Sequence, residues 1–415
     1  MKINVLQQGL KNLLFSCFSL FLMVPTLNSQ DWMKIKTFQP AQTLHCIRFA
    51  NDQVGYTVSS LYNGSTYNIH KTSDGGITWV DQSSGYTATR FKDIWTFSED
   101  TVMMCGNYGL VIRTFDGGEN WIADTVAEAG EHLFGISFVG HTGYVCGNSG
   151  AIYKTTNLGE SWSKVDPPYL SAIEDICFLD EDFGFICGLN LIYYTTNGGT
   201  TWLEPDDFPG ATVNWWLREI SFANDSIGYV CGDIGQIYKT TDRGKNWQYM
   251  PNSPTTESIQ AMTALTENLL YACGFAGTVM RSADGAQSWE MMTAASTQNF
   301  YSIDFTNTGS GFICSQIGEV LRYDDPFMLV SKLDNADQIK LFPNPSSNLI
   351  MVSPITGNEI SDLYNEICIF DLSGVCIGHF RPEQFIDVSS LLPGCYVMAF
   401  YAKNQSISHR TFIKY

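Results

Sequence analysis

Six Asp or Asn side chains recur in short glycine-containing turns, and they are the first residues here that catalysis or metal binding could use. Each precedes a tryptophan by five residues: Asp74 and Trp79, Asp116 and Trp121, Asn157 and Trp162, Asn197 and Trp202, Asp242 and Trp247, Asp284 and Trp289. Such a side chain also accepts backbone N–H bonds and fixes a tight turn, while the tryptophan packs between sheets. Six copies cannot all be active sites, so we interpret them as structural and predict no catalytic residue, metal or cofactor.

Cysteine thiols are the second reactive group, since the chain contains 12 cysteines. Six share one repeat position: Cys105, Cys146, Cys187, Cys231, Cys273 and Cys314. Packed sheets lie about 10 Å apart, whereas a disulfide tolerates roughly 7 Å between Cα atoms. We therefore expect small buried apolar residues. The sequence contains no Cys-x-x-Cys pair, the usual sign of a zinc site. The disulfide candidate is Cys177 with Cys187, which we expect on paired strands.

Side chains that vary between repeats while the scaffold stays fixed are the ones that could bind a ligand. Each repeat starts with a short strand that ends near Phe49, Phe97, Phe138, Phe178, Phe222, Leu265 or Phe305. Four residues earlier stand His45, Asp93, Phe134, Glu174, Arg218, Ala261 and Tyr301. All but Ala261, together with Trp215 and Trp216, which we expect to be exposed, make up the predicted binding face. The alternative is that these residues only pack the loops over a channel.

A basic residue precedes most of the turns: Lys71, Arg113, Lys154, Lys239, Arg281 and Arg322. One interpretation is a ring of positive charge for an acidic partner. We favour the other, in which these are strand ends paired with neighbouring acids, each pair worth under ~1 kcal/mol.

The elements that position these residues follow from the spacing of the tryptophans, which recur in steps of 40 to 45 residues. In the repeat around 220–250, apolar segments near 220–223, 228–231 and 236–240 and the segment after Trp247 are separated by Asn, Asp and Gly turns. Four short strands per repeat at this period are typical of a propeller blade. We count seven first strands but only six complete turns. The segment from Asp31 to Ile35 is therefore expected to complete the last blade and close the ring.

Composition narrows the function classes. The chain has 42 Asp and Glu against 23 Lys and Arg, and its net charge of −19 disfavours nucleic-acid binding. A basic start, the apolar run 13–24 and Pro25 predict a signal peptide over 1–30. That run is shorter than the roughly 20 residues a membrane-spanning helix needs. We expect export to the periplasm and no transmembrane segment in the mature chain.

The repeats resemble the Asp-box families, which include sialidases, sortilin-type receptors, some glucanases and photosystem II stability/assembly factor-like propellers. Turns in nearly every blade, the seven-fold count and the Gly-Tyr-x-Cys/Val-Gly strand are most similar to the last group. The resemblance covers about residues 31–326. It implies an all-β, seven-bladed β-propeller over 31–330 that docks on other proteins. The sequence departs from the motif at Asn157, Asn197 and Ala286, which replaces the second glycine.

The C-terminal part follows a predicted linker over 331–340. Residues 341–415 alternate apolar segments with turn residues and predict a small β-sandwich. Leu341-Phe342-Pro343-Asn344-Pro345, Ile369-Phe370-Asp371-Leu372-Ser373-Gly374, the segment 385–396 and the ending 411–415 occur in order. This order resembles the C-terminal sorting domain of the type IX secretion system of Gram-negative bacteria. It implies that the secretion machinery is a partner and that the product is secreted or attached to the outer-membrane surface. A terminal adhesive or carbohydrate-binding sandwich is the alternative.

Two functions follow from these patterns. We favour a non-enzymatic propeller that binds a protein or glycan partner at the cell surface. The alternative is a secreted glycoside hydrolase of sialidase-like or glucanase-like type. A sialidase-like site needs an arginine cluster, and only Arg48, Arg90 and Arg218 remain after the turn, repeat and C-terminal arginines are set aside. The loops also leave little room to wall a cleft for a glucanase-like pair of Asp residues.

Overall fold

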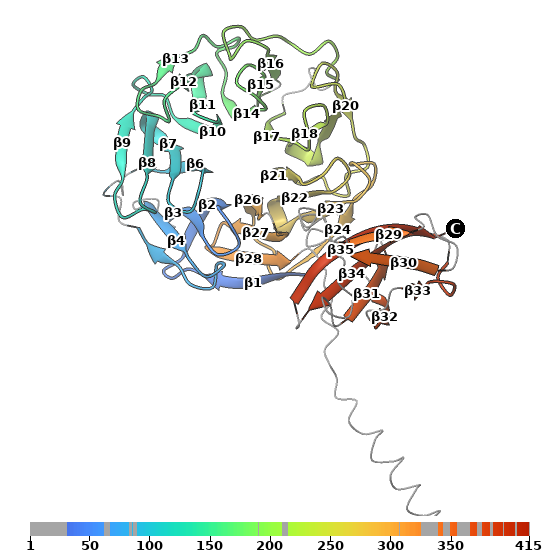
Figure 1. Cartoon of the computed structure of the whole chain (residues 1–415). Helices are drawn as coiled ribbons and strands as arrows, with labels where there is room; N and C mark the ends of the chain where they lie inside the picture. Colours follow the sequence, from blue (N-terminus) through green and yellow to red (C-terminus); the bar gives the residue numbers. More distant parts are fainter. Residues whose placement is uncertain are drawn as a thin grey trace, which may run out of the picture.

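The structure is a computed structural model. It describes residues 31–61, 67–82, 85, 89–189, 191–209, 215–306, 308–324, 339–342, 349–354, 366–371, 376–381, 385–392, 394–402 and 405–414. Regular structure in these residues consists of strands and of four 3-10 turns, η1 (Asn107–Gly109), η2 (Asn148–Gly150), η3 (Asp233–Gly235) and η4 (Phe275–Gly277). Seven sheets, antiparallel except for one short parallel pair in the last, are arranged in a ring (Figure 1), and side chains of their first strands line a central channel. The all-β prediction and the seven-bladed propeller are confirmed.

Six blades are built from consecutive strands, with the first strand next to the channel (Figure 1). Blade 1 contains β2 (Gln42–Phe49), β3 (Gly55–Leu61), β4 (Tyr67–Thr72) and β5 (Val80–Asp81). Blade 2 contains β6 (Phe91–Thr96), β7 (Val102–Gly106), β8 (Leu110–Thr114) and β9 (Ile122–Thr125). Blade 3 contains β10 (Leu133–Val139), β11 (Thr142–Gly147), β12 (Ile152–Thr155) and β13 (Ser163–Lys164). Blade 4 contains β14 (Ile173–Phe178), β15 (Gly184–Gly188) and β16 (Leu191–Thr195). Blade 5 contains β17 (Leu217–Phe222), β18 (Gly228–Gly232), β19 (Ile237–Thr240) and β20 (Gln248–Tyr249). Blade 6 contains β21 (Ile259–Ala264), β22 (Leu270–Gly274), β23 (Val279–Ser282) and β24 (Glu290–Met291). Blade 4 therefore has three strands where the other five have four.

Blade 7 is closed by the N-terminal strand, as predicted. It combines β26 (Phe300–Phe305), β27 (Ser310–Ser315) and β28 (Glu319–Asp324) with β1 (Asp31–Thr37), which pairs antiparallel to β28 with Met33 opposite Arg322. β1 also pairs in parallel with β25 (Thr293–Ala294), a contact that we did not predict. Trp32 is fully buried and stacks on Tyr323 with 5.4 Å between ring centroids. The ring is thus closed by hydrogen bonds and by apolar packing.

The recurring turns hold the same hydrogen bonds in all six copies. The side-chain Oδ1 of the Asp or Asn accepts the backbone N–H four residues later at 2.8–3.0 Å. Asn157 and Asn197 do so as well as the aspartates, which explains why either residue type fits the motif.

The basic residues before the turns link neighbouring blades. Lys71 Nζ donates to the carbonyl of Gly117 at 2.9 Å, and Lys239 Nζ donates to the carbonyl of Gly285 at 2.9 Å. Both glycines belong to the next blade's turn, and Lys154 makes the same bond to Gly198 at 3.1 Å. Predicted pairing with neighbouring acids occurs in this series at Arg113, Arg281 and Arg322. The lysines at this position instead donate hydrogen bonds that join neighbouring blades.

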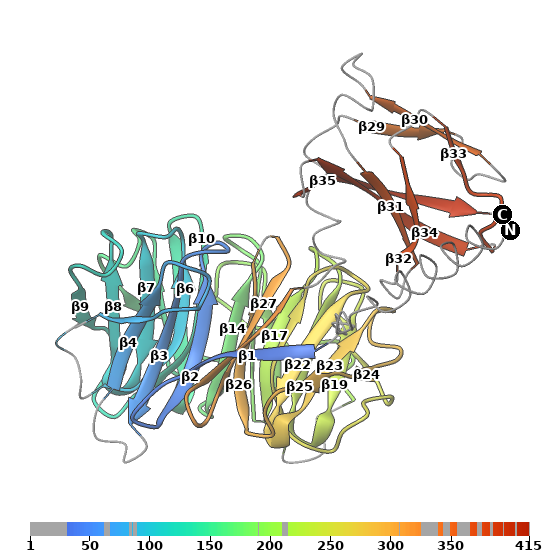
Figure 2. The same ribbon diagram turned by 90° about the horizontal axis from the view of Figure 1, so that it is seen from below.

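The C-terminal part forms two sheets. One contains β29 (Ile339–Phe342), β30 (Leu349–Pro354) and β33 (Phe385–Asp387); the other contains β32 (Cys376–Phe380), β31 (Glu366–Asp371), β34 (Gly394–Ala402) and β35 (Gln405–Lys414). The two sheets are separate layers in Figure 2. Ile350 and Ile386 from the first sheet pack with Ile367, Ile369 and Met398 from the second. This is the packing of a β-sandwich.

The predicted domain boundaries stay predictions. The signal peptide (1–30) and most of the linker (331–340) lie outside the described residues, and β29 begins at Ile339, two residues inside the predicted linker. Among the residues the structure describes, no helix is long and apolar enough to cross a membrane.

Candidate functional site: the channel mouth

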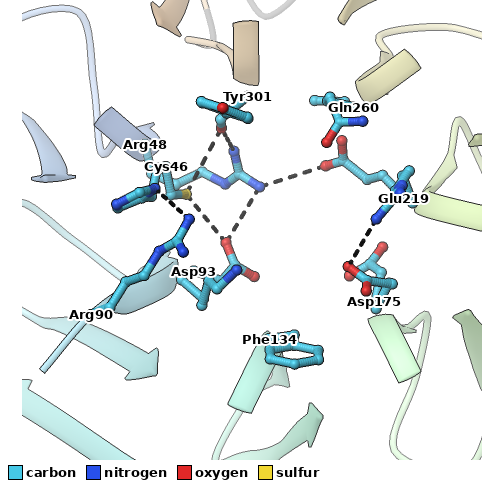
Figure 3. Close-up of a pocket in the computed structure, with 15 residues that line it drawn as sticks. Cys46, Arg48, Arg90, Asp93, Phe134, Asp175, Glu219, Gln260 and Tyr301 are labelled. Atoms are coloured by element: carbon cyan, nitrogen blue, oxygen red, sulfur yellow. Dashed lines mark hydrogen bonds and ion pairs between the residues drawn. The ribbon is translucent and has the colours of Figure 1, made fainter. Parts of the chain in front are cut away.

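The predicted binding positions converge at one end of the channel. His45, Asp93, Phe134, Glu174, Arg218 and Tyr301 all line one cavity of about 200 Å³ (Figure 3). They come from the first strands of six blades, β2, β6, β10, β14, β17 and β26. Antiparallel strands alternate in direction, so the start of each first strand and the Asp-box turn lie at opposite faces of the ring. We call this cavity the channel mouth.

Strand register corrects the predicted residues in two blades. Asp93 lies opposite Cys105, and Ala261 lies opposite Cys273, one position further along the strand than Phe134 or Tyr301. The residues equivalent to Phe134 are Lys92 and Gln260, which also line the mouth. We counted back from Phe97 and Leu265, but the register shows that the equivalents of Phe138 are Thr96 and Ala264. Counting from Ile94 and Met262, the isoleucine-like position of each strand, would have found both.

Trp215 and Trp216 are half-buried, although we predicted them to be exposed. Trp216 forms a β-bridge with Leu189 of blade 4, and its ring lies 5.3 Å from the guanidinium carbon of Arg218. Neither tryptophan is among the residues that line the mouth. Trp216 therefore supports Arg218 from the side.

Arg48 lies deeper in the channel among carboxylates. Its Nη2 is 3.6 Å from Asp93 Oδ1 and 3.6 Å from Glu219 Oε1, and its Nη1 donates to Ser302 Oγ at 2.9 Å (Figure 3). Asp175 and Asp304 also interact electrostatically with this guanidinium. One cation thus serves four acidic side chains from four different blades, and Arg48 itself belongs to a fifth.

The same carboxylates bind the backbone of the following blade. Ile136 N–H donates to Asp93 at 3.1 Å, Ile220 N–H to Asp175 at 2.8 Å, Met262 N–H to Glu219 at 2.8 Å, and Phe49 N–H to Asp304 at 2.7 Å. These N–H groups lie on the channel edge of the first strands, where burial makes an unpaired donor costly. Asp93, which we predicted in the binding face and which lines the mouth, thus also joins blade 2 to blade 3.

We call Arg48 and the four carboxylates around it the inner ring. Burial raises the pKa of three of these carboxylates. Removal from water raises the pKa of Glu219 to about 8, with Arg48 acting in the opposite direction and Asp175 adding to the rise. Burial likewise raises the pKa of Asp175 and of Asp304. A protonated Glu219 near neutral pH relieves repulsion among the acids.

Three basic side chains surround the opening. Arg90 donates to His45 Nδ1 at 3.0 Å. Burial, with Arg90 and Lys92 nearby, lowers the pKa of His45 to about 2, so its ring is a neutral acceptor. Burial and then Arg90 lower the pKa of Lys92 to about 8, and Lys92 Nζ lies 5.3 Å from the centre of the Phe134 ring.

Arg218 is the third cation of the mouth. Its Nη2 is 3.0 Å from Asp233 Oδ1 and its Nη1 is 3.7 Å from Glu174 Oε2. Among the residues the structure describes, Lys92 forms no ion pair or hydrogen bond, whereas Arg218 and Arg90 each form at least one hydrogen bond. The mouth therefore offers an ammonium group to an acidic ligand.

The predicted disulfide is wrong. Cys177 lies opposite Phe185, and Cys187 lies opposite Asp175, so the register separates the two cysteines along the strand pair and both are free thiols. The six cysteines of the shared repeat position are buried, as expected. Burial raises the pKa of Cys105 and Cys231, which keeps these thiols protonated. In the described residues, no group of three His, Cys, Asp or Glu side chains could hold a metal ion.

Comparisons with known proteins support the fold and its two parts. Residues 24–162, 161–262 and 250–324 match the family of the photosynthesis system II assembly factor YCF48, and residues 340–414 match the secretion system C-terminal sorting domain. The photosystem II assembly lipoprotein Ycf48 of Prochlorococcus marinus is 31% identical over a segment that covers 18% of this chain. The match spans about a third of that relative, 34% of its length.

Solved structures share the propeller fold. A structure of YCF48 bound to D1 peptide superimposes with a TM-score of 0.58 at 22% identity and covers 71% of this chain and 97% of that one. YCF48 from Cyanidioschyzon merolae gives 0.57 at 17% identity, covering 70% and 98%, and a streptogramin B lyase gives 0.59 at 13%, covering 70% and 96%. The type IX sorting domain implies secretion. Because the family match extends over most of the propeller, this chain belongs to the family of the photosynthesis system II assembly factor YCF48, joined here to a C-terminal sorting domain.

Proposed function

We propose that this protein is a non-enzymatic binding scaffold at the cell surface, delivered by the type IX secretion machinery, and that a protein partner docks at the channel mouth. The observation that carries the proposal is the convergence of side chains that differ from blade to blade onto one opening, above an inner ring that repeats the same blade-joining bonds. A related YCF48 has been solved with a bound peptide, which supports peptide binding by a propeller of this family.

The partner group that fits the mouth is acidic. Lys92, Arg90 and Arg218 surround the opening, and Phe134 and Tyr301 provide aromatic contact area beside them. Buried aromatic and basic side chains are the residues that dominate binding energy in protein interfaces. An aspartate, glutamate or terminal carboxylate of the partner would form an ion pair with the Lys92 ammonium and neutralise its charge.

A quantitative pull-down from the outer-membrane fraction tests this proposal. We expect the triple variant Lys92→Met, Phe134→Ala and Tyr301→Ala to lose partners that the unmodified protein captures, with unchanged thermal unfolding. The control is Lys245→Met, which removes an exposed lysine from a turn on the opposite face. Equal recovery of the same partners by the triple variant would refute docking at the mouth.

A glycoside hydrolase is the second candidate, because the three arginines left available by the sequence do converge. Arg48, Arg90 and Arg218 line the mouth together with Tyr301. Arg48 and Arg218 are already held by carboxylates, which favours binding over turnover. Release of the fluorophore from a fluorogenic sialoside, or of reducing ends from polysaccharides, would favour the hydrolase; Arg218→Ala should then abolish turnover.

A further inference from the structure

Blade 4 differs from the other blades at its outer edge. Its fourth strand is reduced to one β-bridge, in which Tyr194 N–H donates to Leu203 at 2.9 Å and Leu203 N–H donates to Tyr194 at 2.7 Å. Beyond this bridge, the outer edge of β16, on the side away from β15, has no partner strand among the described residues. This open edge is the outermost strand of the blade, and none of the mouth residues lies on it.

A proline explains the opening. In blades 3, 5 and 6 the third residue after the turn tryptophan donates its N–H to the start of the third strand. These bonds join Val165 to Ile152, Met250 to Ile237 and Met292 to Val279, each at 2.9 Å. Pro205 occupies this position in blade 4 and has no N–H. The carbonyl of Ile192, which is equivalent to that of Ile152, has no hydrogen-bond donor in the described part of the chain.

After Pro205 the chain crosses to blade 5. Asp206 N–H donates to the Lys245 carbonyl at 2.7 Å, and Trp247 N–H donates to the Asp207 carbonyl at 2.9 Å. The ring of Phe208 packs on Tyr238 of β19, with 4.9 Å between centroids. The segment is therefore anchored on the neighbouring blade, which holds the gap beside β16 open.

The gap is a cavity of about 440 Å³, within the roughly 300–1,000 Å³ range of small-molecule sites. Tyr169, Tyr193 and Phe208 supply aromatic walls, and Leu191 and Leu189 supply aliphatic ones. The polar groups are mostly acceptors: the Ile192 carbonyl and the carboxylate of Glu204, whose Oε1 accepts the Tyr193 hydroxyl at 3.0 Å. Burial and Glu204 raise the pKa of Tyr193 to about 12, so this hydroxyl stays a donor to the carboxylate.

We propose that this cavity binds a neutral sugar residue. Among the described residues the lining contains no basic side chain and one carboxylate, which disfavours an anionic ligand. The Ile192 carbonyl, which lacks a donor, and the second oxygen of the Glu204 carboxylate lie beside aromatic walls, and they fit a ligand that presents hydroxyl donors and an apolar face on one small ring, as a pyranose does. The site is separate from the channel mouth and does not rest on the proposed function.

A microarray carrying neutral and acidic glycans, followed by calorimetric titration of the best neutral glycan, tests the assignment. The decisive variant is Pro205→Val, which copies Val165 of blade 3, restores an N–H for the Ile192 carbonyl and closes the cavity. We expect at least about tenfold weaker binding, equivalent to roughly 1.4 kcal/mol, with thermal stability equal to or above that of the unmodified protein. Tyr169→Ala should weaken the same glycan without unfolding the blade, since Tyr169 is half exposed.

The Lys92→Met variant is the matched control, because it changes the mouth and leaves blade 4 intact. Retained glycan binding in Lys92→Met together with loss in Pro205→Val supports the site. Three results would overturn it: no neutral glycan bound on the array, equal binding by Pro205→Val, or saturable binding of choline in place of sugars, which would identify the cavity as a cation site. Loss of the protein partner in the mouth variants leaves this assignment unaffected.

Discussion

Arg48 is surrounded by more carboxylates than one guanidinium can neutralise, and protonation of Glu219 reduces the excess negative charge. Its pKa is raised to about 8, above the ordinary value of about 4.5, chiefly by burial. A raised carboxyl pKa means that the folded protein holds a proton that the unfolded chain releases. Stability from this group is thus complete below about pH 4.5 and is lost as the pH rises through 8.

The free energy of unfolding of Glu219→Gln should therefore rise relative to that of the unmodified protein between pH 5 and 8. Above pH 8 the difference between the two proteins should stay constant. The amide oxygen can still accept the Met262 N–H, so the blade junction survives. The difference should grow by up to roughly 1 kcal/mol per pH unit. Urea unfolding of both proteins between pH 5 and 9 measures it. A parallel pH dependence of the two proteins would show that Glu219 is ionised throughout.

Lys92 gives the mouth a pH dependence of its own. Burial and Arg90 lower its pKa to about 8, so the ammonium forms as the pH falls from 9 to 7. Capture of an acidic partner should strengthen over this interval, and Lys92→Met should remove most of the change. Partner binding measured at pH 7 and pH 9, at constant salt because such attractions are screened, provides the comparison. An unchanged pH dependence in Lys92→Met would assign the effect to another group.

At the scale of elements, the clasp by β1 is the contact on which closure depends. Trp32 is fully buried and meets Tyr323 at 5.4 Å and Phe305 at 5.8 Å between ring centroids. Trp32→Ala should cost about 3–5 kcal/mol, as large aromatic truncations in cores do. Met33→Ala is the control: Met33 is 56% exposed on the same strand, and its loss should stay within about 0.5 kcal/mol. Similar urea midpoints for both variants would mean that β1 does not close the ring.

The sequence allowed the turns and the clasp to be predicted because both depend on local patterns. An Asp or Asn side chain in these turns bonds an N–H only four residues away, and the tryptophan spacing fixes the blade length. In blades 2 and 6, counting back from Phe97 and Leu265 selects Asp93 and Ala261, one residue beyond the equivalents of Phe134, because Thr96 and Ala264 stand where other blades carry phenylalanine. Asp93 and Ala261 nevertheless line the same cavity as their neighbours Lys92 and Gln260.

The inner ring could not be predicted at all. Arg48 bonds Ser302 across 254 residues of sequence, and no local spacing relates Arg48 to Asp93 or Glu219. The effect of Pro205 could not be predicted either. It appears only when blade 4 is compared with blades 3 and 5, where Val165 and Met250 donate an N–H from the same position. Long-range contacts of this kind follow from ring closure and emerge once the blades are superimposed.

At the scale of the whole molecule, the propeller and the C-terminal sandwich each complete their own core. The ring is closed by β1, and every hydrophobic cluster of described residues draws on one of the two parts only. The sorting domain is therefore not needed to finish any blade. Its contribution lies in secretion, which its family match implies.

Deleting residues 339–415 should separate these two roles. The propeller, ending shortly after β28, should unfold at the same temperature as the full chain, because none of its blades loses a strand. The truncated protein should nevertheless stay inside the cell envelope, while the full chain reaches the surface or the medium with a new C-terminus between Asp324 and Ile339. Cell fractionation with mass spectrometry of the mature end, beside circular dichroism of both purified proteins, makes the measurement. Secretion of the truncated chain would show that another segment directs export, and a large drop in its unfolding temperature would show that the sandwich stabilises the ring.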